Sequence, residues 1–213
     1  MRTRVSWRSA RFAVVDIEAT GLDLESDEIV SFGAVPVQGG MIQAGAAVYG
    51  LVRPAQVVTA PVVEIHGIRP QDLESALEPP AALEPLAEAM RGRFPVAHAA
   101  WIERGFLGPA LRPHRMRLPR RWIDTTLLWR VLCIERTGED PGFTPLGVIA
   151  SELGLPVHHP HHALGDALTT AQVFLALATH LEKHHRGSVH GLQRADRRLM
   201  QHEHMRRYVR SFG

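Results

Sequence analysis

Two carboxylates, Asp16 and Glu18, stand two residues apart where the short apolar run FAVV ends. The run predicts a buried strand, and the side chains of a strand alternate between its two faces. Both carboxylates therefore point to one face, where they repel each other unless a cation lies between them. The pair alone is equally compatible with an exposed strand end. The Thr20-Gly21 turn that follows lets a ligand approach the backbone, which favours a cation site.

A histidine and a carboxylate, His161 and Asp166, stand five residues apart at the start of a long helical pattern. A helix N-terminus favours a carboxylate through its dipole alone, so Asp166 also has a purely structural explanation. Three more histidines flank His161, which fits a surface loop or a zinc or nickel site of nitrogen ligands. Neither a cysteine pair nor a His-Glu-x-x-His sequence accompanies them, which argues against the zinc or nickel site.

A third acid, Glu103, begins a helical turn after a strand that ends near His98. Alone it is an ordinary first-turn acid. Carboxylate oxygens suit hard divalent ions, and an imidazole with a pKa of about 6.5 accepts protons near neutral pH. Two cations beside a general base are the equipment for cutting a phosphodiester bond. That composition is present in five side chains: Asp16, Glu18, Glu103, His161 and Asp166.

Composition sets broad limits on the rest of the chain. Its 213 residues suit one domain, and 45% hydrophobic and 22% charged residues are ordinary for a soluble globular protein. The net charge of +2 permits a polyanionic partner without requiring one. The single cysteine, Cys133, cannot form an internal disulfide, and no apolar run is long enough for a signal peptide or membrane span. We therefore expect a cytoplasmic protein without a membrane partner.

Hydrophobic periodicity and turn signals predict an α/β fold, a mixed sheet flanked by helices. Early strands read as hairpins with a Gly39-Gly40 turn, and later strands alternate with helices. The residues 120–136 read as a strand running into a helix that Asp124 or Thr125 caps, and Thr144 is the expected cap of a later helix. The other expected strands are 11–16, 28–37, 41–54 and 94–100, and the other helices 80–93, 101–111, 143–155 and 162–185.

Three motifs, DIEATGL, VAHAAWIERGFL and HHALGDALTTAQVF, resemble in order and separation the DnaQ-like 3′–5′ exonucleases of the DEDDh group. This group includes the epsilon proofreading subunit of bacterial DNA polymerase III and ribonuclease T. The sequences EIHGI and WIDTTLLWR are lesser echoes, and the resemblance covers about residues 11–182. It implies a ribonuclease H-like fold with a five-stranded mixed sheet. We expect an exonuclease domain over residues 1–187 and a basic, helical C-terminal tail over 188–213, lying on the domain or projecting from it.

The resemblance also assigns roles to the five side chains. Asp16, Glu18 and Asp166 would bind one Mg²⁺ or Mn²⁺ ion. Asp16 would bridge to a second such ion supported by Glu103, and His161 would be the general base. The chain departs from the family at Ala99, where Asn is usual, and at Glu103, where Asp is usual. The longer arm of Glu103 moves its carboxylate oxygens by ~1.5 Å unless the backbone compensates.

The substrate implied by the resemblance is the 3′ end of a single strand. Thr20, Gly21 and Leu22 would lie beside the terminal nucleotide, and His66 either faces it or bonds the backbone. The leading hypothesis is a metal-dependent exonuclease that releases nucleoside 5′-monophosphates from DNA, in proofreading or repair. Alternatives are an RNA-trimming enzyme of the same chemistry and a non-catalytic module that binds nucleic acid or a polymerase. A DNA polymerase partner and a homodimer are both compatible with the family.

Overall fold

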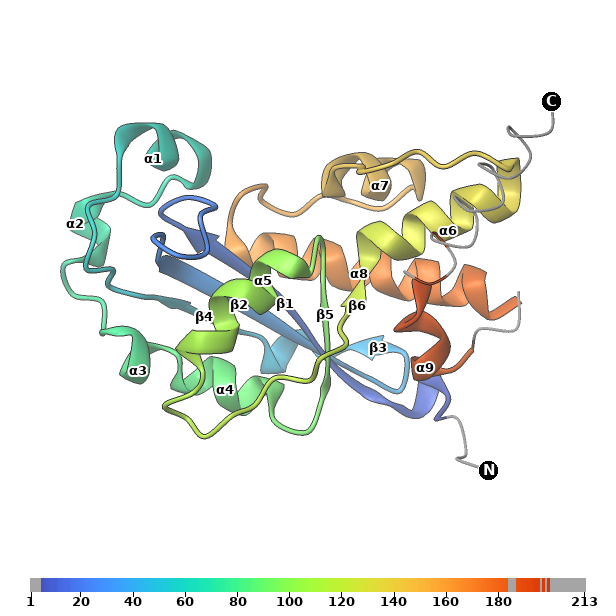
Figure 1. Ribbon diagram of the computed structural model, residues 1–213, viewed down its shortest axis with the longest axis horizontal. Coiled ribbons are helices and arrows are strands. Elements are labelled where there is room, and N and C mark those ends of the chain that lie inside the picture. The colour runs from blue at the N-terminus through green and yellow to red at the C-terminus, as the bar shows by residue number, and fades with distance from the viewer. Residues whose placement is uncertain (1–4, 184–186, 196, 198, 200–213) are drawn as a thin grey trace.

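The computed structural model describes residues 5–183, 187–195, 197 and 199. It contains one mixed sheet in the strand order β3-β2-β1-β5-β6, and β4 also pairs with β2 (Figure 1). β2 is antiparallel to β1, whereas β5 and β6 run parallel to β1 and to each other, as the predicted fold class requires. The strands are β1 (Arg11–Ala19), β2 (Ile29–Gln38), β3 (Met41–Ile42), β4 (Val48–Leu51), β5 (Phe94–Ala97) and β6 (Ile123–Asp124).

The third strand expected from the sequence is split into β3 and β4. Gly39 and Gly40 both have positive φ, so the predicted hairpin turn leads from β2 into β3. The chain then forms a short 3₁₀ turn at Ala44–Ala46 before β4 pairs with the other half of β2. None of these three turn residues is buried. The predicted five-stranded sheet therefore has six strands by count, two of them halves of one.

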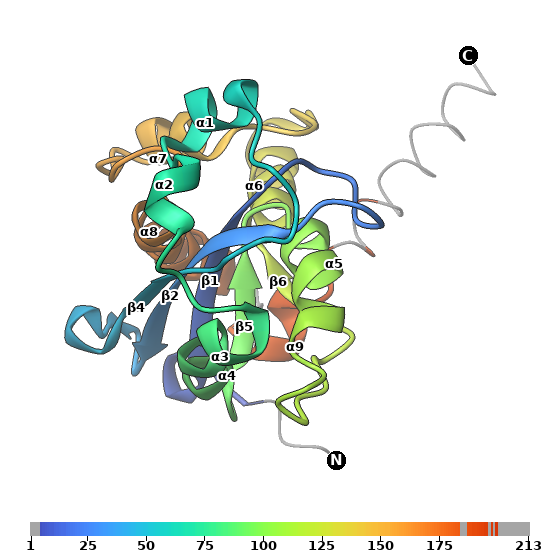
Figure 2. The ribbon, with the colours of Figure 1, turned by 90° about the vertical axis from the view of Figure 1, so that its left-hand side faces the viewer.

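Helices cover both faces of this sheet. α8 packs across β1 and β2 with α6 and α7 beside it, whereas α4 and α5 contact the opposite face (Figure 2). The helices are α1 (Ala60–His66), α2 (Pro70–Leu73), α3 (Pro79–Ala82), α4 (Glu84–Met90), α5 (Trp101–Ala110), α6 (Thr125–Thr137), α7 (Leu146–Glu152), α8 (Ala163–Leu181) and α9 (Val189–Leu192).

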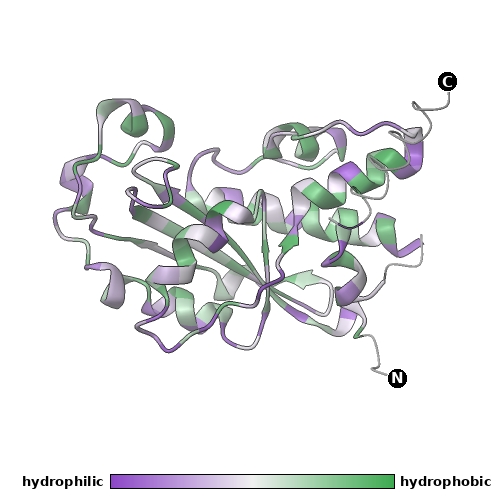
Figure 3. Cartoon of the chain, viewed as in Figure 1, coloured by the Kyte–Doolittle hydropathy of each residue, from purple (hydrophilic) through white to green (hydrophobic). Residues whose placement is uncertain are grey.

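The side chains of β1 alternate between two apolar cores. Phe12 and Val14 belong to the core beneath α8, and Ala13 and Val15 belong to the core beneath α4 and α5. In Figure 3, hydrophobic and hydrophilic residues alternate along helices such as α6. Asp16 continues the series of Phe12 and Val14, as does Glu18 two residues later. The prediction that both carboxylates share one face is therefore confirmed, and that face is the one covered by α8.

Two helix boundaries differ from the prediction. The helix expected over 80–93 is divided into α3 and α4 at Leu83, because Pro85 has no N–H to donate four residues back. Thr144 is not a helix cap, since Pro145 stays extended and its carbonyl accepts the first helical hydrogen bonds of α7. The prediction for Asp124 is confirmed, because its carboxylate accepts a hydrogen bond from the backbone N–H of Thr126.

The beginning of the predicted tail packs on the domain. Val189 and Leu192 of α9 are buried in the core that α8 covers, and the Val189 N–H donates to the Val5 carbonyl. Ala195 and Leu199 are buried in the same core, whereas residues 196, 198 and 200–213, with the arginines from Arg206 onward, lie outside the described residues. Among the helices that are described, none combines the length and apolar character needed to cross a membrane.

Candidate active site

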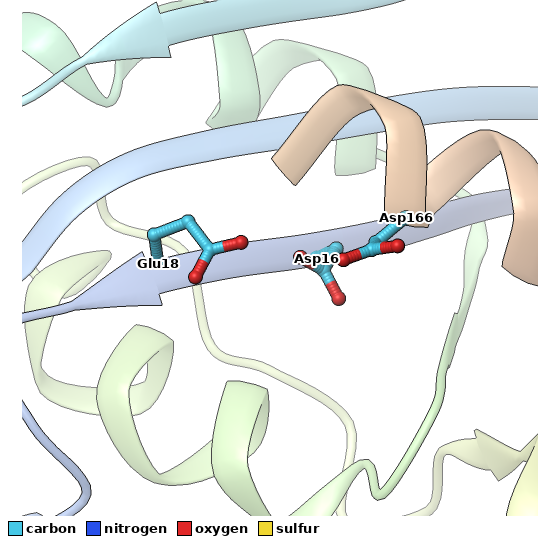
Figure 4. A group of neighbouring side chains, drawn as sticks. All are labelled: Asp16, Glu18 and Asp166. Atoms are coloured by element: carbon cyan, nitrogen blue, oxygen red, sulfur yellow. The ribbon is translucent and has the colours of Figure 1, made fainter. Parts of the chain in front are cut away.

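Three carboxylates meet where the end of β1 passes beneath the first turn of α8. Asp16 and Glu18 extend from β1 and Asp166 from α8, so residues 150 positions apart in sequence become neighbours (Figure 4). One carboxylate oxygen of each lies within 4.8 Å of the oxygens of the other two. Three oxygen ligands at this spacing match the donor set that divalent ions such as Mg²⁺ and Mn²⁺ prefer.

The approach of α8 depends on a glycine in the neighbouring strand. Gly33 of β2 is the direct partner of Asp16 in the antiparallel ladder. A Cβ built on Gly33 would overlap the Ala163 carbonyl and lie 2.5 Å from the Cα of Leu164. Only a residue without a side chain lets the start of α8 rest on the sheet here. This contact sets the position of Asp166 above Asp16.

Burial and mutual repulsion raise the pKa values of these carboxyls. The pKa of Asp16 is raised well above its ordinary value, first by burial and then by the charges of Glu103, Glu18 and Asp166. Burial, followed by the Asp166 charge, raises the pKa of Glu18 to about 7. Burial also raises the pKa of Asp166, against the lowering effect of the His161 backbone N–H. Proton or cation binding would relieve this repulsion.

Glu103 brings a fourth carboxylate to the group from the first turn of α5. Its side chain is buried, with 3% of the residue exposed, and its Oε2 has no hydrogen-bond partner among the described residues. Burial raises its pKa well above the ordinary value, and the charges of Asp124 and Glu18 raise it further. After burial, the charge of Glu103 is the strongest of the neighbouring charges that raise the pKa of Asp16. The structure thus brings Glu103 to the site, although it lies outside the close triad of Asp16, Glu18 and Asp166.

Asp124 supports the position of Glu103, a role that the sequence interpretation did not give it. Its carboxylate accepts hydrogen bonds from the backbone N–H groups of Ala100, at 3.0 Å, and Thr126, at 2.9 Å. These bonds fasten the turn that precedes α5 to the first turn of α6. The motif WIDTTLLWR contains Asp124, but the sequence predicts for this residue only a helix cap.

His161 lies beside Asp166, and its side chain is exposed. Its φ is +59°, in the left-handed region, and its backbone N–H donates to Asp166 Oδ2 at 2.8 Å. His162 instead caps α8 by accepting from the Gly165 N–H at 3.4 Å, and its ring stacks on Tyr49 at 4.6 Å. Within the described part of the chain, no side-chain hydrogen bond holds the His161 ring. The predicted general base is thus the histidine whose ring is available.

The three residues predicted to contact a nucleotide lie in the loop after β1. The Thr20 hydroxyl donates to Asp27 at 2.8 Å and accepts from the Glu28 N–H at 3.0 Å, so it braces this loop. Gly21 lies against the Asp27 carboxylate, where a side chain would clash. Leu22 is 67% exposed. Of the three, Leu22 is the one whose side chain has the surface needed to meet a ligand.

His66 makes the backbone hydrogen bond that is one of its two expected roles. Its Nδ1 accepts a hydrogen bond from the Ile68 N–H at 3.0 Å, and burial lowers its pKa. The neutral ring therefore carries its proton on Nε2, which is buried without a partner in the described structure. No hydrogen bond or ion pair among the described residues joins His66 to the carboxylates.

The position where the family usually has Asn is also explained by backbone geometry. Ala99 has φ of +58°, a left-handed conformation in which Asn is much more common than Ala. The preceding His98 is largely buried, and its Nδ1 lies 3.0 Å from the Thr125 hydroxyl. Burial lowers the pKa of His98 to about 4, so this histidine is neutral and fixes the turn that leads to Glu103.

Comparisons with known proteins agree with this site. A family model described as an exonuclease, RNase_T, matches residues 13–174. A PolC-type DNA polymerase III of Thermotoga maritima is 33% identical over 175 residues, which are 82% of this chain and 12% of that protein. The DNA polymerase III subunit epsilon of Aquifex aeolicus is 26% identical over 201 residues, which are 92% of this chain and 95% of the subunit.

A solved structure shares the fold. The nuclease domain of 3′hExo, a DEDDh family member bound to rAMP, has a TM-score of 0.65 at 18% identity, with 82% of this chain and 94% of that one covered. The span of the family model contains all four carboxylates and His161. The chain belongs to the exonuclease family, in the DnaQ-like, DEDDh group that its three motifs resemble.

Proposed function

We propose that the protein is a 3′–5′ exonuclease that hydrolyses the terminal phosphodiester bond of single-stranded DNA with the help of two divalent ions. The observation that carries this proposal is the convergence of Asp16, Glu18 and Asp166 within 4.8 Å, with Glu103 buried nearby. Such a cluster is costly in an ion-free fold, because burial raises all four pKa values and repulsion raises those of Asp16, Glu18 and Glu103 further.

The donor set fits hard cations. All four candidate ligands offer carboxylate oxygens, and the unpartnered Oε2 of Glu103 is a buried acceptor that a cation would satisfy. Asp16, Glu18 and Asp166 would hold one Mg²⁺ or Mn²⁺, and Asp16 with Glu103 the second. Bound ions would supply charge neutralisation at the phosphate and a lowered pKa of the attacking water.

His161 is assigned the proton transfer. Its ring is exposed beside Asp166 and no hydrogen bond in the described structure restrains it. The ring would accept the proton of the water that attacks phosphorus, and the 3′ oxygen of the preceding nucleotide would leave. The released product is a nucleoside 5′-monophosphate, and the shortened strand keeps a free 3′-hydroxyl.

The loop after β1 is assigned the terminal nucleotide. Leu22 would pack against its base, a contact that tolerates any base sequence. Gly21 would let the sugar approach the backbone, and Thr20 would hold the loop in place through Asp27. The Nε2–H of His66 is assigned to the same nucleotide, because it is a donor without a partner in the described residues.

DNA is favoured because these relatives are named as DNA polymerase III proteins. The epsilon subunit also matches this chain over nearly the full length of both proteins. Association with a DNA polymerase is part of the proposal for the same reason. RNA trimming is the second candidate, since the DEDDh neighbour 3′hExo was solved with a ribonucleotide, rAMP. The carboxylates act on the phosphate, which both nucleic acids share, so they do not discriminate between them.

The test is turnover of 5′-labelled 20-nucleotide DNA and RNA strands with Mg²⁺, Mn²⁺ or EDTA. Stepwise shortening from the 3′ end, abolished by EDTA and by Asp16→Asn, is expected, with DNA shortened faster. Faster shortening of RNA would replace DNA by RNA as the substrate. Folded protein that binds Mn²⁺ but shortens neither strand would refute the catalytic proposal in favour of a binding module.

A further inference from the structure

A second polar feature lies away from the carboxylates, between α5 and the segment 111–122 that connects it to β6. Together they line a cavity of about 1040 Å³. This connection appears along the lower edge of the molecule in Figure 1, and much of it carries the hydrophilic colour in Figure 3. Five of the residues that line the cavity are arginines: Arg104, Arg112, Arg115, Arg117 and Arg120. We call this set the arginine pocket.

The fold holds the arginine pocket in shape. Leu111 is fully buried, and its carbonyl accepts a hydrogen bond from the Met116 N–H at 3.4 Å. The His114 ring lies 2.6 Å from the Glu84 carboxylate of α4, and Trp122 is buried where the segment enters β6. Buried anchors thus alternate with exposed arginines along the segment. Arg115 has φ of +54°, a left-handed conformation that a non-glycine residue adopts only when its surroundings impose it.

The positive charge of the pocket is uncompensated in the described structure. All five arginines are exposed, and none of them forms an ion pair with a carboxylate of the described residues. Arg104 donates to the Arg120 carbonyl at 3.2 Å, which joins the α5 side of the cavity to the far end of the segment. Five guanidinium groups, carried by a segment that buried residues hold in place, create a positive potential that attracts an anion with several charges.

The arginine pocket and the carboxylate site share one helix. Glu103 stands in the first turn of α5, and Pro109 at its other end lines the pocket. Glu103 and Pro109 are six residues apart, which corresponds to a helical rise of ~9 Å. A stacked nucleic-acid strand rises ~3.4 Å per nucleotide, so this separation corresponds to about three nucleotides. A strand whose 3′ end lies at the carboxylates therefore has phosphates within reach of the pocket.

We propose that the arginine pocket binds the phosphodiester backbone of the substrate strand, beginning about three nucleotides from the 3′ end. This inference rests on the proposed exonuclease function, because that function places the 3′ end at the carboxylates. Guanidinium forks contact phosphates without reading bases, so the pocket strengthens the binding of any sequence. A trinucleotide with a free 5′-hydroxyl has only two phosphates, and it ends before this point.

The test compares Arg112→Gln/Arg117→Gln with the control Arg11→Gln/Arg136→Gln, which removes two exposed arginines elsewhere. Fluorescence anisotropy in EDTA gives the affinity for a labelled 20-nucleotide strand as a function of salt. Turnover of a trinucleotide with Mn²⁺ gives the activity of the carboxylate site alone. We expect the pocket variant to lose at least about fivefold in affinity at low salt. The slope of its salt dependence should fall by about 1.4, since each phosphate contact to a single strand contributes about 0.7.

The trinucleotide turnover of the pocket variant should equal that of the wild type and the control. Unchanged affinity and slope for the 20-nucleotide strand would overturn the proposal, and so would an equal loss of trinucleotide turnover. Unchanged DNA affinity with reduced binding to phosphatidylserine vesicles would assign the pocket to a membrane instead. Wild-type protein that shortens no strand would refute the exonuclease function alone, and the affinity measurement would still decide whether the arginines bind the strand.

Discussion

The backbone of Ala163 rests directly on Gly33, at the strand position paired with Asp16. The contact seats the first turn of α8 on the sheet and thereby places Asp166 over Asp16. Ala163 is itself fully buried, which explains why a small residue stands two positions after His161. Backbone packing, rather than an interaction between the carboxylates, holds the group together.

Gly33→Ala is therefore expected to disturb both folding and ion binding. The added methyl group would overlap the α8 backbone and lower the free energy of unfolding by about 1–3 kcal/mol. The rise in Tm that Mn²⁺ causes should also shrink, because Asp166 moves away from Asp16. Gly45→Ala is the matched control, since a methyl group there meets open space. Wild-type stability and ion response in Gly33→Ala would show that the contact is not what positions α8.

Replacing each of two adjacent histidines should separate catalysis from stability. His161→Ala should keep the Mn²⁺-induced rise in Tm and lose about 10²–10⁴-fold in turnover, the range expected for a general base. His162→Ala removes the α8 cap and the contact with Tyr49, so it should cost about 1 kcal/mol of stability and keep most turnover. Full turnover in His161→Ala, or the reverse pattern between the two variants, would contradict the assignment of His161 as the base.

Ion binding should strengthen as the pH rises. The native pKa of Glu18 is about 7, above its ordinary value of 4.5, so the ion-free fold keeps a proton that the unfolded chain has lost. The stabilisation from this proton is complete below about pH 4.5 and disappears as the pH rises through 7. In EDTA, the contribution of Glu18 to Tm should thus decline over this window. With excess Mn²⁺ the ion takes the place of the proton, so the Tm difference between Mn²⁺ and EDTA should be larger at pH 8 than at pH 5. An equal difference at both values would contradict the carboxylates as ligands.

Glu103→Gln should raise the stability of the ion-free protein and lower its activity. The neutral amide has nearly the same shape and removes a buried acid that Asp16 and Asp124 repel, so Tm in EDTA at pH 8 should rise, by about 1–3 kcal/mol in unfolding free energy. The same change removes a proposed ligand, and turnover of a DNA strand should fall at least about 100-fold. Glu152→Gln, on the exposed side of α7, controls for the loss of one negative charge. A Glu103→Gln variant with lower stability in EDTA and full turnover would show that Glu103 is structural.

Much of this arrangement could be predicted because it follows from local patterns. The period-two alternation around Asp16 and Glu18 predicts that their side chains share one face of the sheet. The long apolar periodicity after His161 predicts α8. The Gly39-Gly40 turn and the cap at Asp124 are also local signals, and both are present in the structure. The three motifs then supplied the grouping, which local reasoning could not provide.

The remainder depends on contacts between distant segments. The sequence gives no sign that Gly33 meets Ala163, or that the 3₁₀ turn at Ala44–Ala46 divides a strand. The burial of Glu103 depends on the turn that precedes α5. Asp124, which lies 21 residues after Glu103, fastens this turn. The arginines from Arg112 to Arg120 are visible in the sequence as a charge run, but only the folded segment shows that they line one cavity.

The division of the third strand has a consequence for how copies of the protein meet. An edge strand with a long row of free amides can recruit another chain by continuing the sheet. Here the outer strands that the structure describes are short, four residues in β4 and two each in β3 and β6, and a turn interrupts one edge. Neither edge offers a template long enough for stable intermolecular strand pairing. A homodimer would therefore be built from helix and loop surfaces, and the sheet itself is protected against edge-to-edge aggregation.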